Sequence, residues 1–270
     1  MRKLKLSNLI FSILTMIVFI IFLFPFVWML LGSLKTQSEV MDANSMFVFT
    51  PTFDNYLNVF VNNHFFRFMV NSFIVALGTT LFSLILGLPA AYSIARNKLH
   101  HLANIILFTR MVPPIAFLIP WFILFTKLGL VDSFTGLILS NMVIMLPFII
   151  WIMIPYFEST PMEIEEAGLI EGCSRTQIFL KLVLPISVPG IITCSMMSFI
   201  FTWNNFLFSV IFAGDKTKTL PVAVFNFMSY SNIDWGALMA AAFIITLPII
   251  IMAIVMHRYI VSGLAAGVGK

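Results

Sequence analysis

The sequence predicts an all-α integral membrane protein with six transmembrane helices and a helix-turn-helix loop between the fourth and the fifth. Two observations predict this fold class. The chain of 270 residues is 60% apolar, and only 10% of its residues are charged, whereas about a quarter is usual for a soluble domain. The apolar residues also form six long runs, each of about 20 residues or more, which is enough to cross about 30 Å of hydrocarbon.

The charges and cysteines exclude other classes. The formal charge is +4, but the basic residues are scattered between apolar runs and form no cluster with aromatic side chains, so nucleic-acid binding is not expected. Cys173 lies in the central loop and Cys194 in a predicted span. Two cysteines so placed indicate neither a disulfide framework nor a metal site.

The first predicted span is residues 9–31, a run of 23 residues without a charge, which follows the basic residues Arg2, Lys3 and Lys5. The alternative is a cleaved signal peptide. Such a peptide has a shorter apolar core and a small-x-small cleavage site, which the sequence lacks here, so an uncleaved span is expected. Residues 32–67 are polar and rich in turn-forming residues, which predicts an external loop with short helical pieces.

The remaining spans are predicted at residues 68–95, 102–125, 134–156, 190–212 and 237–260. Three domains result: residues 1–65 with the first span, residues 66–261 as the transmembrane domain, and residues 262–270 as a tail.

The third span contains Arg110 and the prolines Pro113, Pro114 and Pro120. Prolines within a spanning helix are expected to kink it. A charge inside a span indicates function by default. The alternative is that Arg110 lies near the headgroups and extends its guanidinium toward them. Both interpretations of Arg110 stay open at this stage.

The distribution of Lys and Arg predicts the orientation. With the amino terminus inside, the cytoplasmic segments hold nine basic residues and the external segments hold five, with Arg110 set aside. Basic residues favour the cytoplasmic side. Both termini and the central loop, residues 158–189, are therefore expected in the cytoplasm.

The central loop has the local signals of two helices joined by a turn. Thr160–Glu163 reads as a capping box with Pro161 at the first helical position. Gly172 supplies the backbone freedom that ends such a helix. Ser174–Gln177 is a second capping box, and Pro185 is expected to end the second helix.

The first helix of the loop carries a small or apolar strip that includes Ile164, Ala167 and Gly168, which would let another surface approach closely. The alternative is an amphipathic helix lying on the membrane. Such helices usually carry Lys and Arg toward anionic lipid, whereas this one is acidic. The sequence therefore favours a helix that docks into a protein.

The segment Glu165–Gly172, followed by Ile178-Phe179 and Leu184-Pro185, resembles the EAA loop of bacterial ABC importer permeases. The resemblance is closest to carbohydrate-uptake permeases, in the maltose-permease-like class of second subunit. The sequence departs from that pattern by small or charge-conserving changes at three positions, Gly168, Glu171 and Cys173. Weaker resemblances extend toward the carboxy end, at Asn71–Gly78, Arg110–Pro114, Phe201–Asn204, Thr219–Val222 and Gly263–Val268.

The resemblance implies a multi-pass subunit in the inner or plasma membrane of a bacterium, in contact with lipid. Its expected partners are a second permease subunit, two ATPase subunits and an extracellular solute-binding protein. ATP and Mg would be bound by the ATPase, with no cofactor in this chain. The sequence itself contains no GxxxxGK[ST] phosphate loop, so the chain is expected to be a transport subunit rather than an enzyme.

The resemblance also implies roles in ATPase coupling. Glu166 is expected to be the main polar anchor, while Ala167 and Gly168 allow close approach and Gly172 sets the angle between the helices. The remaining residues of this set are Glu163 and Glu165, expected to be caps or solvated charges rather than contacts, and Arg175, which could pair within the loop or with the ATPase.

Candidate residues of a translocation pathway are Asn71, Arg110, Asn141, Trp203, Asn204 and Asn205. An aromatic face and side-chain amides suit a sugar ring and its hydroxyls. The alternative for the amides and the tryptophan is packing between helices, where amides provide hydrogen bonds.

The sequence bears on three other functions. A polyol or a glycerol-phosphate-like solute could be imported by the same mechanism. An ion-coupled secondary transporter would place acidic or histidine side chains within spans, whereas all eleven acidic residues fall outside them. An intramembrane enzyme would need a metal motif or a nucleophile with a base, and the spans contain neither.

Overall fold

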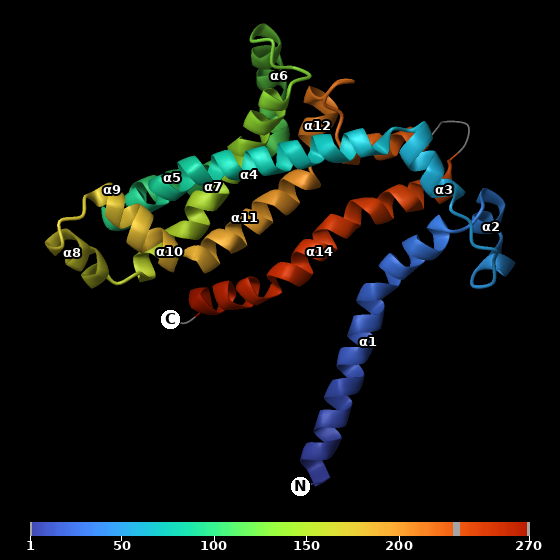
Figure 1. The fold of residues 1–270 in the computed structure, drawn as a ribbon, viewed down its shortest axis with the longest axis horizontal. Coiled ribbons are helices and arrows are strands. Elements are labelled where there is room, and N and C mark those ends of the chain that lie inside the picture. The colour runs from blue at the N-terminus through green and yellow to red at the C-terminus, as the bar shows by residue number, and fades with distance from the viewer. Residues whose placement is uncertain (1, 229–232, 269–270) are drawn as a thin grey trace. The chain divides into compact units, whose positions relative to one another are not determined.

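The computed structural model describes the backbone of residues 2–228 and 233–268, and the side chains of residues 8–225, 227–228 and 233–256. Within these residues every regular element is a helix (Figure 1), which confirms the predicted all-helical fold class. The chain divides into two compact units, Met1–Phe66 with Val224–Pro248, and Arg67–Ala223 with Ile249–Lys270. The basic residues Arg2, Lys3, Lys5, Arg258 and Lys270 lie outside the described side chains, as do Gly263–Val268 and the expected tail at 262–270.

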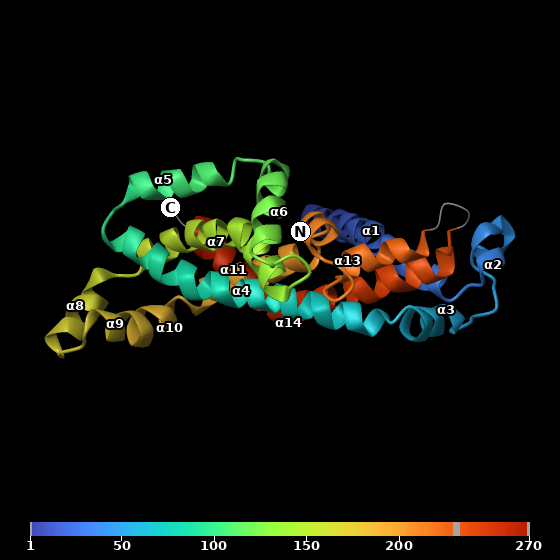
Figure 2. The same ribbon diagram turned by 90° about the horizontal axis from the view of Figure 1, so that it is seen from above.

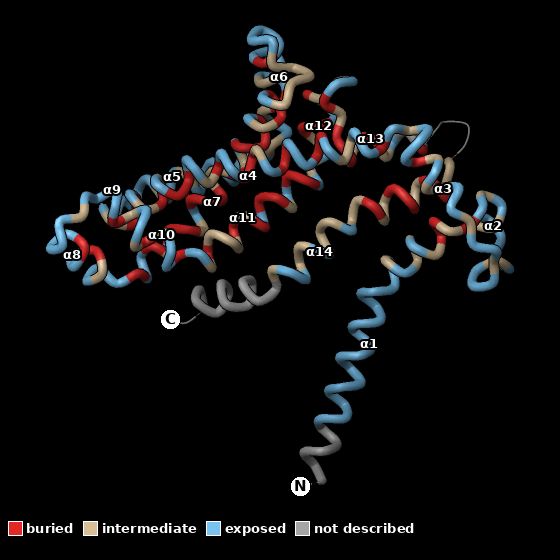
Figure 3. Tube along the Cα trace, viewed as in Figure 1, coloured by how far each residue is buried: buried red, intermediate tan, exposed pale blue. Residues whose placement is uncertain are grey.

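The first unit begins with the long helix α1, Arg2–Ser33. Its apolar side chains are largely exposed, such as Phe11 at 72% and Phe22 at 71% (Figure 3). An apolar helix with this much free surface is suited to lipid. The short elements that follow are α2 (Gln37–Met41), η1 (Ala43–Ser45), α3 (Asp54–Leu57) and η2 (Asn58–Asn62).

Side-chain bonds to the backbone hold these short elements. The Asn55 amide donates to the carbonyl oxygens of Ser33, at 2.8 Å, and Lys35, at 2.7 Å. Lys35 is only 5% exposed and donates to the Met46 carbonyl oxygen at 2.7 Å. Its ammonium also lies 4.8 Å from the centre of the Phe49 ring, a cation–π contact that offsets part of the cost of burying the charge.

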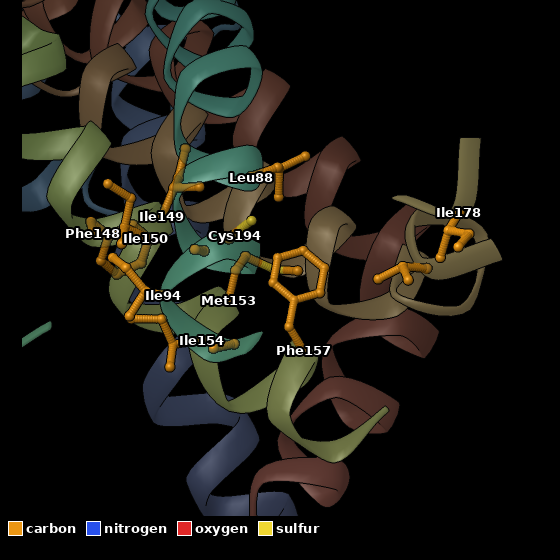
Figure 4. Packing of buried hydrophobic residues seen from close by; sticks show 13 residues of the cluster. Leu88, Ile94, Phe148, Ile149, Ile150, Met153, Ile154, Phe157, Ile178 and Cys194 are labelled. Atoms are coloured by element: carbon orange, nitrogen blue, oxygen red, sulfur yellow. The ribbon is translucent and has the colours of Figure 1, made fainter. Parts of the chain in front are cut away.

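The second unit is built around α4 (Phe65–Arg96), α7 (Phe134–Ser159) and α11 (Val188–Trp203). Figure 4 shows apolar side chains of α4 and α7, such as Leu88, Met153 and Phe157, gathered in one cluster. Gly87 lets α4 approach closely, since a Cβ there would lie 3.0 Å from the Cγ2 of Ile149. In a bilayer, close packing at small residues replaces the hydrophobic effect as the force between helices.

The third predicted span, residues 102–125, is not one continuous helix. It consists of α5 (His100–Thr109), the short η3 (Pro114–Phe117) and α6 (Leu118–Lys127), with a bend of 82°. Pro113 and Pro114 account for the break, because proline lacks the N–H that would continue the helical bonds. The expected kink is thus a full interruption.

The fifth predicted span, residues 190–212, is also interrupted. α11 ends at Trp203, and α12 (Leu207–Phe212) starts after a turn in which the Asn205 side chain accepts a hydrogen bond from the Phe208 N–H at 3.0 Å. Among the described residues, four helices are long and apolar enough to span a membrane, or six if two bent pairs each count as one span, namely α5 with Pro114–Lys127 and Arg175–Ile186 with α11. The other helices are α13 (Leu220–Ala223), η5 (Val224–Phe227) and α14 (Trp235–Val268).

Asp132, in the turn between α6 and α7, holds the segment that follows α12. Its carboxylate accepts hydrogen bonds from the N–H groups of Gly214 at 2.9 Å, Lys216 at 3.3 Å and Thr217 at 3.0 Å, and from the Thr217 hydroxyl at 2.8 Å. Although burial raises the pKa of Asp132, these hydrogen bonds outweigh it and hold the pKa below its ordinary value.

The amino-terminal half of α4 holds the same segment. The Asn71 amide donates to the carbonyl oxygens of Lys216, at 3.1 Å, and Lys218, at 2.9 Å. The Ser72 hydroxyl accepts from the Leu220 N–H at 2.8 Å. Residues 214–220 are therefore fixed by side chains from two separate parts of the chain.

We predict that Asp132→Ala lowers the free energy of unfolding by about 2 kcal/mol near neutral pH, because several hydrogen bonds to a charged group are lost. Asp132→Asn should cost less, because its amide oxygen can still accept and asparagine tolerates the φ of 55° at this position. The folded-state pKa is lowered, so the carboxylate stabilises the fold above about pH 4, and this contribution disappears as the pH falls through the lowered pKa.

Thermal unfolding of the purified protein in detergent measures these effects. The melting temperatures of the wild type and Asp132→Asn should converge as the pH is lowered below about 4. Equal melting temperatures for all three proteins at pH 7 would contradict the role assigned to Asp132.

Candidate functional site

The helix-turn-helix lies beside the Arg96 end of α4 and the Ser159 end of α7 (Figure 2). It consists of α8 (Met162–Ile170), α9 (Arg175–Ile178), the wide turn η4 (Phe179–Val183) and α10 (Leu184–Ile186). The bend between this second helical stretch and α11 is 78°. The sequence therefore predicts the two helices and their order correctly.

The turn after α8 is a Schellman motif. The Gly172 N–H bonds to the Leu169 carbonyl at 3.0 Å, and the Cys173 N–H bonds to the Gly168 carbonyl at 2.9 Å. Gly172 has a φ of +82°, a conformation that side chains other than glycine rarely adopt. The predicted role of Gly172 in ending the helix is confirmed.

The capping predictions have mixed outcomes. Ser174 and Gln177 form the predicted capping box at the start of α9. The predicted box at Thr160–Glu163 is wrong, because Pro161 occupies the N-cap position and the Thr160 hydroxyl donates to the Tyr156 carbonyl at 3.2 Å. The second helical stretch ends at Ile186, one residue after Pro185, which agrees with the predicted end of this helix.

One face of α8 packs against the second helical stretch. Gly168 is buried, and a Cβ there would lie 2.8 Å from the Cδ1 of Leu182 and 3.1 Å from the Cγ1 of Ile178. A groove of about 400 Å³ runs along this contact. Its lining includes four residues of the strip that the sequence indicates, Ile164, Ala167, Gly168 and Glu171, together with Glu163 and Leu182.

The prediction that Glu165 is a cap or a solvated charge is wrong. Its side chain is buried, and it forms an ion pair with Arg96 in which the Arg96 Nε donates at 2.5 Å. Its other carboxylate oxygen accepts from the Tyr92 hydroxyl at 2.6 Å. Arg96 and Tyr92 belong to α4, so a residue of the loop is bonded to a spanning helix.

Sequence reasoning did not include Tyr92 and Arg96 among the site residues. Both lie in the last turns of α4, one helical turn apart, so their side chains share a face of the helix. The four-residue spacing of Tyr92 and Arg96 is the signal in the sequence that could have indicated a shared site. It does not identify Glu165 as their partner, because Glu165 follows 69 residues after Arg96.

The remaining surface of α8, named here its open face, is exposed. Glu166 lies on the side of the helix away from Gly168, Glu163 and Ala167 are exposed at the edge of the groove, and Arg175 at the start of α9 is also exposed. Two apolar side chains at the end of α8 are also exposed, Leu169 at 50% and Ile170 at 88%. Acidic and apolar groups on one exposed helical end form a surface that can bind a protein carrying a cationic rim around an apolar cleft.

The candidate pathway residues do not form one cluster. Asn71 bonds to residues 216 and 218, and the buried Asn141 donates to the Leu137 carbonyl at 2.8 Å within its own helix. Trp203 is 1% exposed and stacks on Phe199 at 5.7 Å.

The two following asparagines lie at the break in the fifth span. Asn204 is exposed and donates to the Ile200 carbonyl at 2.9 Å, while the Asn205 side chain accepts from the Phe208 N–H in the first turn of α12. The amides of both residues thus satisfy backbone groups that the interruption leaves without helical partners.

Arg110 lies at the break between α5 and α6 and lines a cavity of about 90 Å³ with aromatic walls, among them Trp121 and Phe208. Its guanidinium lies over two rings of α7, at 5.1 Å from the centre of Phe148 and 5.5 Å from that of Trp151. Ligand pockets usually measure about 300 Å³ or more, so this cavity alone does not hold a sugar.

Comparisons with known proteins agree with this geometry. Residues 83–265 match the family model described as the inner membrane component of binding-protein-dependent transport systems. The chain is 34% identical over 254 residues to a trehalose transport system permease protein of Mycobacterium tuberculosis, covering 92% of each chain. It is 32% identical over 277 residues to a trehalose/maltose transport system permease protein of Thermococcus litoralis, covering 100% of this chain and 99% of the relative.

The fold also resembles a solved structure. A chain of a bacterial ABC transporter that imports the acidic polysaccharide alginate aligns with a TM-score of 0.81 at 22% identity. The alignment covers 96% of this chain and 98% of that chain.

We predict that Gly168→Val separates α8 from the second helical stretch, because its branched side chain would overlap Leu182 and Ile178. Gly172→Ala serves as the comparison, since nothing lies within 4 Å of its Cβ and only backbone strain of about 1 kcal/mol is added. Limited proteolysis of the purified protein should show faster cleavage in residues 158–189 for Gly168→Val than for Gly172→Ala. The reverse order would show that the close approach at Gly168 does not hold α8.

Proposed function

The chain belongs to the family of binding-protein-dependent transport system inner membrane components, and on this premise we propose that it forms half of the translocation pathway for a sugar in an ATP-driven importer. Members of this family are transport permeases rather than enzymes, in agreement with the sequence prediction. The importer function implied by the EAA-like loop is confirmed at the level of the family.

The named functions of the relatives support a carbohydrate as the solute. The relatives in M. tuberculosis and T. litoralis are named for trehalose and maltose. Another relative, 33% identical over 250 residues, is named for sulfoquinovosyl glycerol transport, so sugars with quite different substituents occur within the group. A polyol or glycerol-phosphate-like solute is less favoured, and an ion-coupled mechanism finds no support in these relatives.

The expected assembly pairs this chain with a second permease, two ATPase subunits and an extracellular solute-binding protein. The observation that supports ATPase docking is the open face of α8, where Glu166 and Ala167 lie beside the exposed Leu169 and Ile170. A cleft on the ATPase with basic side chains at its edge would complement this surface. Glu163 and Arg175 are also exposed and lie within reach of such a partner.

We predict that Glu166→Lys and Ile170→Asp each reduce the amount of ATPase subunit that co-purifies with the permease by at least about tenfold, equivalent to about 1.4 kcal/mol. The first change reverses the anchoring charge, and the second places a charge where an apolar side chain would be buried. Glu158→Lys is the matched control, because Glu158 is an exposed acid at the end of α7, before the helix-turn-helix. Undiminished co-purification of both variants would contradict docking at this face.

We also place the helix-turn-helix and both termini in the cytoplasm, supported by the excess of Lys and Arg in the segments on that side. In this orientation residues 214–220, held by Asp132 and Asn71, face the exterior.

A reporter that is active only in the cytoplasm tests the orientation. Fused after Ser174 it should be active, and fused after Lys216 it should be inactive. Activity in the opposite pattern would reverse the orientation and would remove α8 from contact with a cytoplasmic ATPase.

A further inference from the structure

Arg96 bonds to both sides of the corner between α7 and α8. Its guanidinium forms the ion pair with Glu165 of α8, and its Nη2 also donates to the Thr160 carbonyl at the end of α7, at 3.3 Å. Arg96 is the last residue of α4. One side chain thus connects the carboxy ends of two spanning helices to the short helix that follows the second of them.

The carboxylate of Glu165 is held at both oxygens, one by Arg96 and one by Tyr92. The side chains of Arg96 and Glu165 are only 12% and 10% exposed, so salt and water screen the pair little. A carboxylate with two donors in fixed positions has little freedom to rotate away. The bond is therefore more rigid than an exposed ion pair would be.

The ring of Tyr92 is itself fixed by packing. Its centre lies 5.7 Å from that of Phe157 in α7, edge to face, and 4.9 Å from that of Phe179 in η4. Tyr92 therefore cannot follow Glu165 without moving α4, α7 or η4. The three residues Tyr92, Arg96 and Glu165, named here the α4–α8 linkage, join α8 to the bundle through specific bonds.

The alternative path from α8 to a span runs through apolar packing. Gly168 contacts Ile178 and Leu182, and this second helical stretch leads into α11 across a 78° bend. Without the α4–α8 linkage, a displacement of α8 would reach the spans through its chain connection to α7 and through the apolar packing of the second helical stretch. With the linkage, the same displacement also acts on α4 through an ion pair and hydrogen bonds, and α4 extends about 48 Å for its 32 residues.

We propose that the α4–α8 linkage transmits nucleotide-driven displacement of α8 to the spanning helix α4, with Arg96, Tyr92 and Glu165 as positioning residues for that step. This inference depends on the proposed docking of an ATPase to the open face of α8. It assigns different tasks to two adjacent glutamates: Glu166 faces the partner, whereas Glu165 faces the bundle.

The test uses the assembled permease–ATPase complex in proteoliposomes, with Cys173 and Cys194 replaced by serine and with spin labels at Ser93→Cys in α4 and Met197→Cys in α11, two exposed positions. Addition of ATP with Mg²⁺ should change the distance between the labels in the otherwise unaltered complex. In Glu165→Gln and Arg96→Met, the ATPase should still co-purify and hydrolyse ATP, but the population that shows the changed distance should fall by about tenfold, within the range of coupling between sites.

Two further variants separate transmission from a loss of folding. Tyr92→Phe keeps the packed ring and removes only the hydroxyl, so a smaller fall in the changed population is expected. The exchange Arg96→Glu with Glu165→Arg restores opposite charges and should recover part of the response that each single change abolishes. Glu158→Gln, a neutralised exposed acid outside the linkage, should behave as the wild type.

A full distance response in both Glu165→Gln and Arg96→Met would overturn the proposal. Loss of ATPase co-purification in these two variants would also overturn it, because the pair would then belong to docking. If the unaltered complex bound no ATPase at all, the proposed function would fail instead, and that failure is distinct from these outcomes.

Discussion

The ion pair between Arg96 and Glu165 holds α8, the helix whose docking to an ATPase is the basis of the proposed function. α8 has nine residues, which is too short to be a stable helix in water without tertiary contacts. Its apolar packing is limited to one strip around Gly168. The ion pair and the Tyr92 hydroxyl bond α8 to α4 through Glu165, while the packing at Gly168 on another side of the helix leaves Glu166 and Ile170 exposed.

Much of the helix-turn-helix could be predicted because its signals are local. Gly172 and the pair Ser174 and Gln177 act through backbone groups a few residues away, so the sequence nearby contains all the information. Glu165 and Glu166 are adjacent acids with the same local context. They differ because successive helical residues point about 100° apart, and only the position of α4 determines which of the two meets a cation.

The number and approximate location of the apolar runs could also be predicted, but not their continuity. Hydropathy measures whether a segment is apolar enough to enter the bilayer, and the interrupted third span meets that criterion when α5 and α6 are taken together. The interruptions depend on which side chains form hydrogen bonds with the backbone N–H and carbonyl groups that lose their helical partners. In the fifth span the side chains of Asn204 and Asn205 bond to backbone groups on either side of the break. The third span breaks at consecutive prolines beside Arg110.

The two interruptions lie close together, since Trp121 of α6 stacks on Phe208 of α12 at 6.2 Å, and both rings line the cavity that contains Arg110. Non-helical backbone at membrane depth is tolerated only where protein or a cavity surrounds it. α4 and α7 continue as single helices through Pro89, Pro147 and Pro155, whereas a broken helix can change its angle at the break. The α4–α8 linkage therefore joins the helix-turn-helix to continuous members of the bundle, and the broken members α5–α6 and α11–α12 are the ones whose breaks can absorb a change in angle.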